Sequence, residues 1–247
     1  MTRWVLVGLI LALPARAAEL TVLTAGAFKP VVAAVTSAFE ARTGDNVVLR
    51  NDTVGSLVRR IEGGEAFDVV LMSPSGLEAL AASGKIAPGS SVPLAKVGIG
   101  VGVRVGAPAP DIGTVEAFKA AMLGARAVAI IDPVSGGSSG VYLEKLFRTM
   151  GIEQAMAPKL VLVRGGLAAE AVVDGRADLV VHQISEIVAV PGVAMVGPLP
   201  GEIQSETVYA GAVGSGSATP DAARAFLAAL SGPGMQPMLL AKGMMSP

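Results

Sequence analysis

Short apolar runs rich in valine, isoleucine and leucine recur along this chain, and segments with helical periodicity separate them. This alternation predicts βα units with mixed, mostly parallel sheets, so the expected fold class is α/β. One run, residues 69–72, is apolar at every position, which is typical of a central strand covered on both faces. The strands are predicted at 20–24, 47–50, 68–72, 97–103, 127–131, 160–163 and 179–181.

The pattern also predicts two lobes with a cleft between them. Extended runs near 97–105 and 205–213 are expected to cross between the lobes as a hinge, giving lobe 1 as 18–97 plus 210–247 and lobe 2 as 98–209. Ligands of open α/β sheets bind at the carboxyl ends of the strands, so the cleft is the expected site. Apolar residues at helical spacing mark three of the helices, namely Val31, Val35, Ala38 and Phe39, then Leu143, Leu146, Phe147 and Met150, and finally the segment 220–230.

The first seventeen residues have the pattern of a secretory signal peptide. Arg3 precedes an apolar run of about ten residues, Pro14 breaks it, and Ala15-Arg16-Ala17 provides small residues around a cleavage point. The run has about half the length that a membrane-spanning helix needs. We therefore expect a mature chain that begins at Ala18, is exported to the periplasm and is not inserted in the membrane.

Composition excludes several classes of protein and site. The chain has no cysteine, so neither a disulfide nor an N-terminal lipid-bearing cysteine is available. Removing Arg3 and Arg16 leaves 19 − 2 = 17 basic residues against 20 acidic ones, which argues against nucleic acid as a partner. A single histidine without cysteine predicts no metal site. We expect a monomer that uses no cofactor.

Two loops that follow predicted strands in the first half of the chain are candidate anion sites. In the first, 24–30, Gly26 permits close backbone approach and Lys29 places a positive charge where a helix begins. A solvated lysine beside an ordinary turn is the alternative interpretation. In the second, 52–56, Thr53 and Ser56 offer hydroxyl groups, although capping of the next helix also explains both residues.

Two further loops lie in the expected second lobe. The segment 132–140 carries Ser138 and Ser139 at a predicted helix start, and it lacks the spacing of nucleotide-binding loops and of the nucleophilic serine motif. It is therefore either an anion-binding turn or a plain loop. Arg164 follows one strand and can grip a carboxylate, although a surface ion pair is its ordinary role. His182 follows the next strand as either a ligand-binding residue or a buried structural one.

The chain resembles the periplasmic molybdate-binding proteins, within the type II periplasmic solute-binding superfamily. The resemblance extends over nearly all of the chain after residue 17, and it is carried by the segments 20–27, 57–64, 67–71, 132–133, 139–142 and 222–230. It implies two α/β lobes that close on a small oxyanion, which is then delivered to a membrane ABC permease.

The resemblance also implies ligand residues from which this chain departs. Molybdate binders place serines where this chain has Ala27 and Val54, and a tyrosine where it has His182. Each missing donor costs on the order of 1–3 kcal/mol, so an organic di- or tricarboxylate is favoured over molybdate. The first expected function is capture of that anion for uptake. The alternatives are the related aconitate isomerase activity, with His182 as the base, and a ligand-binding partner of a two-component sensor.

Overall fold

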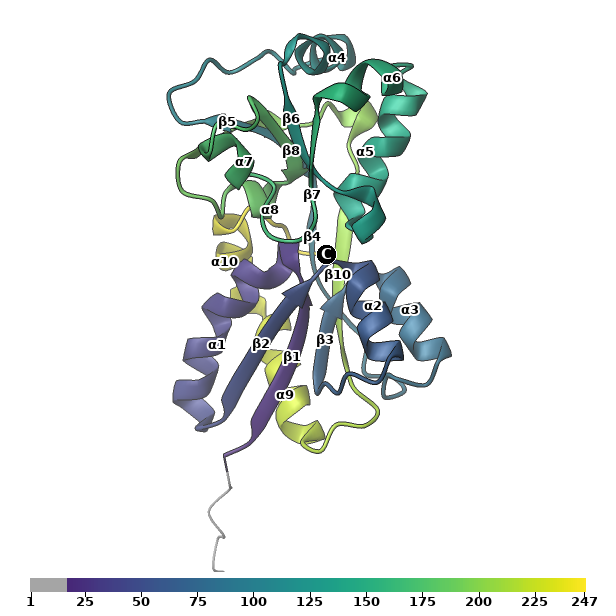
Figure 1. The fold of residues 1–247 in the computed structure, drawn as a ribbon. Helices are drawn as coiled ribbons and strands as arrows, with labels where there is room; N and C mark the ends of the chain where they lie inside the picture. The colour runs from purple at the N-terminus through teal and green to yellow at the C-terminus, as the bar shows by residue number, and fades with distance from the viewer. Residues whose placement is uncertain (1–16) are drawn as a thin grey trace, which may run out of the picture.

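The computed structural model describes residues 17–247 and arranges them as two stacked lobes, each built on a five-stranded sheet (Figure 1). The strand order is β2-β1-β3-β10-β4 in the first sheet and β7-β6-β8-β5-β9 in the second. Nearly all of the predicted signal peptide lies outside the described residues. None of the helices in residues 17–247 is long and apolar enough to cross a membrane. The expected α/β class is confirmed.

Strands and helices alternate along most of the chain as the apolar pattern predicted, although β9 and most of β4 were not predicted. The strands are β1 (Glu19–Ala25), β2 (Asn46–Asp52), β3 (Val69–Met72), β4 (Val92–Val97), β5 (Ile99–Arg104), β6 (Val128–Ile131), β7 (Leu160–Val163), β8 (Leu179–Gln183), β9 (Val193–Pro198) and β10 (Thr207–Val213). The helices are α1 (Lys29–Thr43), α2 (Val54–Glu62), α3 (Pro74–Ala82), α4 (Val115–Gly124), α5 (Ser138–Thr149), α6 (Glu153–Met156), α7 (Glu170–Val173), α8 (Ile184–Ile187), α9 (Pro220–Ser231) and α10 (Gln236–Ala241).

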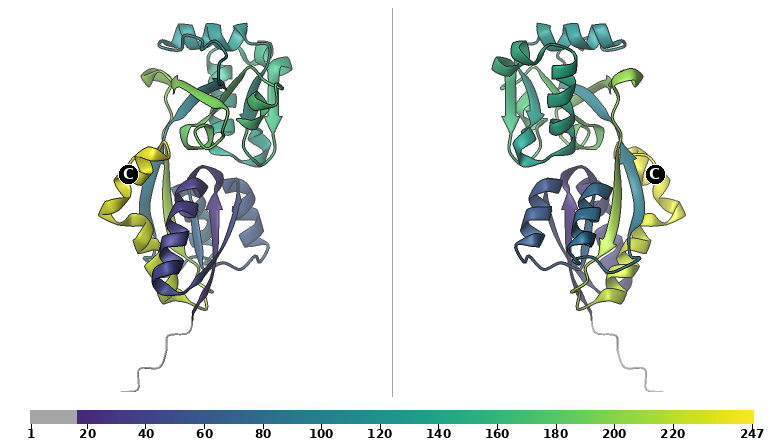
Figure 2. Two further views of the ribbon diagram at one scale, coloured as in Figure 1. Left: turned by 90° about the vertical axis from the view of Figure 1, so that its left-hand side faces the viewer. Right: turned by 90° about the vertical axis from the view of Figure 1, so that its right-hand side faces the viewer.

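Both sheets are mixed, and the strands that carry the chain between lobes account for the antiparallel pairs. Strands β1, β2 and β3 pair in parallel, as do β6, β7 and β8. The expected single strand at 97–103 is instead two strands, β4 and β5, that meet at Gly98 and belong to different sheets. The return connection runs from β9 to β10, and Figure 2 shows both connections on one side of the molecule.

A glutamine ties these two connections together at the junction of the lobes. The side-chain amide of Gln204 accepts a hydrogen bond from the Ile99 N–H (2.8 Å) and donates one to the Ile99 carbonyl (2.9 Å). A Cβ at Gly98 would lie 3.1 Å from the Gln204 side chain, so a glycine suits the close approach here. Paired crossing strands of this kind are suited to hinge motion of the lobes.

Helices cover both faces of each sheet. In the first lobe α1 and α9 pack together on one face, while α2 and α3 pack together on the other. Val31, Val35 and Phe39 of α1 are buried as predicted, whereas Ala38 is exposed and lies outside the packed stripe. All four residues of β3 are buried, in agreement with its uniformly apolar sequence. The buried strands hold their carboxyl ends, and the loops that follow them, in fixed positions facing the other lobe.

Candidate functional site

A pocket of about 330 Å³ lies between the lobes, where the loops that follow β1, β2, β6, β7 and β8 meet. Seven of the nine residues predicted for the site line it, namely Gly26, Ala27, Thr53, Ser138, Ser139, Arg164 and His182. Lys29 and Ser56 do not line it. The lining also includes residues that the sequence interpretation did not select, namely Asn51, Asp52, Gln183, Glu186 and Tyr209.

Lys29 lies beside a second cavity rather than in this pocket. It is exposed at the first position of α1 and lines a cavity of about 610 Å³ with Lys242, Glu170 and Ser185. The short 3-10 turn Gly26–Phe28 precedes the helix, and Lys29 at its start contributes to this second cavity and not to the pocket. Glu186 lines both cavities, as do Gly26, Asn51 and Gly166, so the two cavities adjoin.

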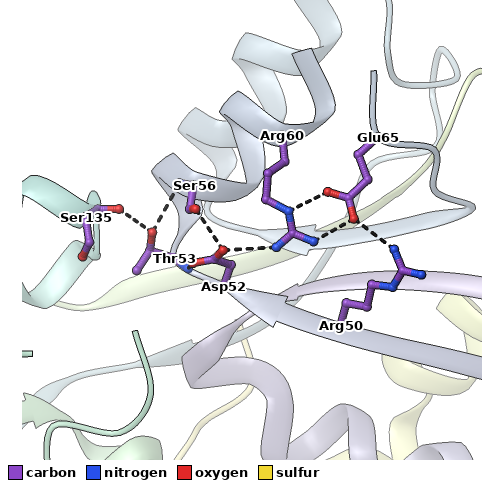
Figure 3. Close-up of polar contacts among 7 residues, drawn as sticks. All are labelled: Arg50, Asp52, Thr53, Ser56, Arg60, Glu65 and Ser135. Carbon is purple, nitrogen blue, oxygen red and sulfur yellow. Dashed lines mark hydrogen bonds and ion pairs between the residues drawn. The ribbon is translucent and has the colours of Figure 1, made fainter. Parts of the chain in front are cut away.

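The loop after β2 holds its polar groups in an internal network (Figure 3). The Ser56 hydroxyl donates to Asp52 Oδ2 (2.9 Å), and Arg60 donates to the same oxygen (3.1 Å). Arg60 also contacts Glu65 through two nitrogens, which lowers the pKa of that carboxyl. The Ser56 hydroxyl therefore anchors the loop, and its physical role is to hold Asp52 at the edge of the pocket.

Thr53 links the two lobes at the mouth of the pocket. Its hydroxyl caps α2 by accepting from the Ser56 N–H (3.3 Å) and donates to the Ser135 carbonyl of the other lobe. Beside this contact the Gly55 N–H points to the Gly136 carbonyl (3.5 Å). A Cβ at Gly136 would lie 2.9 Å from Gly55 Cα, so only glycine permits this approach. The lobes are thus in contact at this side of the cleft.

The second lobe supplies the donors that suit an anion. Ser138 and Ser139 begin α5, where the first amides of a helix have no intrahelical acceptor. Arg164 Nε donates to the buried carboxylate of Asp132 (2.6 Å), and this contact lowers the pKa of Asp132. Arg164 lines the pocket with 78% of its side chain exposed, and the contact with Asp132 uses Nε and leaves its two terminal nitrogens available to a ligand.

A buried imidazole and carboxyl group form the floor of the pocket. His182, the last residue but one of β8, has Nδ1 2.8 Å from the Ser139 hydroxyl. Its Nε2 lies 3.2 Å from Glu186 Oε2 in the following short helix α8. The side chains of His182 and Glu186 are 3% and 8% exposed. A Cβ at Gly26 would lie 2.6 Å from Glu186 Oε1, so that oxygen occupies the space that the glycine leaves free.

Burial shifts both members of this pair toward their uncharged forms. Desolvation lowers the pKa of His182 to about 4 and raises the pKa of Glu186 to about 8. The pair therefore holds one proton at neutral pH, whether it resides on the carboxyl or on the imidazole. A carboxyl group with a pKa near the working pH is suited to accept and return a proton.

Tyr209 reaches this floor from the other lobe. Its hydroxyl donates to Gln183 Oε1 (2.9 Å), and its ring stacks on Phe28 with centroids 5.9 Å apart. Burial and the neighbouring Glu186 carboxyl raise the pKa of Tyr209, so the phenol stays protonated. The Gln183 Nε2 group is fully buried and has no hydrogen-bond partner within residues 17–247. A ligand oxygen in the pocket would give this amide its acceptor.

The residues that sequence reasoning missed carry only weak local signals. Glu186 stands in the first turn of a helix, where an acidic residue ordinarily complements the helix dipole. The spacing of four residues from the single histidine was the available signal. Tyr209 comes from β10, twenty-six residues beyond Gln183, and only the crossing of the chain between lobes brings the two together. No cluster of three or more metal-ligating side chains occurs among the described residues.

Comparison with known proteins defines the class. Residues 20–245 match the family described as bacterial extracellular solute-binding protein, and the chain belongs to that family. The periplasmic molybdate-binding protein of Azotobacter vinelandii superposes with a TM-score of 0.79 at 22% identity, covering 93% of this chain and 100% of that one. The sulfate-binding protein of Mycobacterium tuberculosis gives a TM-score of 0.73 at 20% identity, covering 93% and 87%. The fold is therefore that of two-lobed periplasmic binding proteins, as the resemblance predicted.

A more similar sequence comes from an enzyme. A protein named aconitate isomerase, from a Pseudomonas species, is 38% identical over 214 residues, which cover 84% of this chain and 80% of that protein. The proteins to which this chain is similar thus include two binding proteins named for small anions and a relative that carries the name of an isomerase.

Proposed function

We propose that this chain is an isomerase that interconverts cis- and trans-aconitate by moving one proton within the cleft between its lobes. The observation that carries the proposal is the buried pair of Glu186 and His182 at the floor of a pocket otherwise lined by hydrogen-bond donors and an arginine. The similarity to the Pseudomonas protein named aconitate isomerase supports the choice of substrate.

The reaction is an allylic proton transfer. A base removes a proton from the methylene carbon of aconitate, and the electron pair of that C–H bond moves into the allylic system. The proton is then returned to the former vinyl carbon, where a new C–H bond forms while the double bond occupies its new position. Rotation about the former single bond of the allylic intermediate before this return sets the geometry of the new double bond and gives the other isomer. No oxidant or reductant is needed.

The pocket has the groups that this transfer needs. The terminal nitrogens of Arg164 hold one carboxylate, and the hydroxyls and amides of Ser138 and Ser139 hold a second. The unpaired Gln183 amide donates to the carboxylate on which negative charge develops. The contact between Thr53 and Ser135 keeps the lobes together over the substrate and limits the entry of water.

The buried acid is suited to proton transfer. Burial raises the pKa of Glu186 to about 8, so near neutral pH the carboxyl is close to the balance between its two protonation states. A group of this kind can accept the proton of an allylic C–H bond and return it, whereas retention of an anion needs only the hydrogen-bond donors of the pocket.

Capture for uptake is the second candidate function. The family and the two lobes that meet across the cleft support it, because solute-binding proteins close around their cargo before meeting an ABC permease. In that case the mature chain resides in the periplasm and takes an organic di- or tricarboxylate. Molybdate is disfavoured because Ala27 and Val54 line the pocket where hydroxyl donors would be needed.

Two assays on one sample distinguish these candidates. A proton NMR time course with cis-aconitate, and separately with trans-aconitate, measures conversion. A thermal-shift series with both aconitates, citrate and molybdate measures binding. The proposal predicts conversion in both directions toward one common ratio. Stabilisation by an aconitate without any conversion would reject the isomerase and support the receptor.

A further inference from the structure

We infer that Glu186 is the catalytic base that moves the proton, and that His182 is a positioning residue that holds its carboxyl group. This inference rests on the proposed isomerase function. It departs from the expectation that His182, as the single histidine of the chain, is the base.

Each nitrogen of the His182 ring faces a protein group. Nδ1 lies 2.8 Å from the Ser139 hydroxyl, and Nε2 lies 3.2 Å from Glu186 Oε2. The Nε2 atom is fully buried and has no hydrogen-bond partner within residues 17–247, so the Glu186 carboxyl is its polar neighbour. This placement suits a residue that orients the Glu186 carboxyl.

The Glu186 carboxyl is placed differently. One oxygen, Oε2, faces the imidazole, whereas Oε1 lies where a side chain at position 26 would begin. Gly26 and Glu186 both line the pocket, and neither carboxyl oxygen of Glu186 is among the fully buried polar atoms that lack a hydrogen-bond partner. Because Gly26 has no side chain, Oε1 packs against it at the wall of the pocket, and the carboxyl is therefore the group of the pair that can reach the reacting atoms.

The second cavity gives the proton of Glu186 a path to solvent. Glu186 lines both the substrate pocket and the adjoining cavity of about 610 Å³. A proton taken from the substrate can therefore exchange with water through the second cavity before its return. The expected result is partial incorporation of solvent hydrogen into the product during a single turnover.

Several ionisable groups line the two cavities that Glu186 shares. They are His182 of β8, Tyr209 of β10, Arg164 and Asp52 at the substrate pocket, and Lys29, Lys242 and Glu170 at the second cavity. Burial is nevertheless the dominant influence, and it raises the pKa of Glu186 to about 8. The rate constant kcat/KM should consequently rise with pH toward about 8 as the carboxylate forms.

The test compares three variants with the wild-type protein. Glu186→Gln keeps the shape of the side chain and removes the base. His182→Gln places an amide donor near the position of Nε2, which supports the carboxylate without acting as a base. Glu202→Gln, at an exposed position in the segment that joins β9 to β10, is the matched control. Each variant is assayed for conversion from pH 5.5 to 9, and its aconitate affinity is measured by calorimetry.

The expected results separate the two roles. Glu186→Gln loses at least 10³-fold in kcat and keeps its affinity within tenfold. His182→Gln keeps measurable turnover, and the inflection of its pH profile moves to lower pH because the amide stabilises the carboxylate. Turnover of Glu186→Gln within tenfold of wild type, or complete loss of turnover in a His182→Gln variant that still binds, would overturn the assignment. Absence of conversion by the wild-type protein would instead reject the proposed function itself.

Discussion

Replacing Glu186 with glutamine is expected to change how the stability of the protein depends on pH. The pKa of this carboxyl is about 8 in the fold, against an ordinary value of 4.5. Between these two values the folded state binds one proton more than the unfolded state at this position. The free energy of unfolding therefore falls by about 1.4 kcal/mol for each unit of pH in this range.

His182 acts in the opposite direction over a lower range. Its pKa is about 4 in the fold, against an ordinary value of 6.5, so between these values the unfolded state binds one proton more. The two contributions cancel from about pH 4.5 to 6.5, and the contribution of Glu186 alone remains from 6.5 to 8. The wild-type pair thus costs on the order of 2 kcal/mol of stability between pH 6.5 and 8. The change of the unfolding free energy with pH depends only on the number of protons bound in each state. The result is therefore the same whichever atom of the pair carries the proton.

Glu186→Gln should remove this loss. The stability difference between the variant and the wild-type protein is expected to grow by about 1.4 kcal/mol per pH unit from pH 4.5 to 8, in favour of the variant. Urea unfolding at pH 5, 6, 7 and 8, followed by circular dichroism, measures it, since the single tryptophan lies in the predicted signal peptide. Glu202→Gln is the control. A difference that stays constant across these pH values would refute the burial argument.

Two other substitutions test the anion clamp and the contact between lobes. Arg164→Gln should raise KM for aconitate about 10- to 100-fold and leave kcat within a few-fold, while Arg176→Gln, which removes an exposed ion pair, changes neither. An unchanged KM in steady-state kinetics would contradict the clamp. Gly136→Ala should hold the lobes apart because its Cβ would meet Gly55, whereas Gly151→Ala has a similar positive φ but open space around it. Small-angle scattering should show a larger radius of gyration for Gly136→Ala, and equal radii for the two variants would contradict this role.

The sequence was sufficient to predict the fold because its apolar runs are short and separated by clear helical patterns. Runs such as 160–163 coincide with β7, and the all-apolar run 69–72 is the buried strand β3. The boundary between two strands within the run at 97–103 was harder to predict. Valine and isoleucine continue on both sides of Gly98 while the chain passes from one sheet to the other. Pairing partners, rather than local composition, decide where such a strand divides.

The site was predictable in its outline and less so in its chemistry. Loops that follow buried strands had to meet at the cleft, so Gly26, Ser139 and His182 were accessible to sequence reasoning. The direction in which a side chain points could not be predicted in this way. Lys29 begins a helix that turns it toward the second cavity, and Ser56 uses its hydroxyl on Asp52. The role proposed for Glu186 depends on its burial and on the packing of its Oε1 atom against Gly26, and only the folded chain brings these about.

Proton transfer in this cleft is tested most directly by a proton NMR time course of the mature protein with trans-aconitate in deuterated water. Transfer through Glu186 predicts formation of cis-aconitate together with deuterium at the methylene carbon of the product, because the proton held by Glu186 exchanges with solvent through the second cavity. Trans-aconitate that binds but yields neither the cis isomer nor deuterium incorporation would contradict proton transfer here.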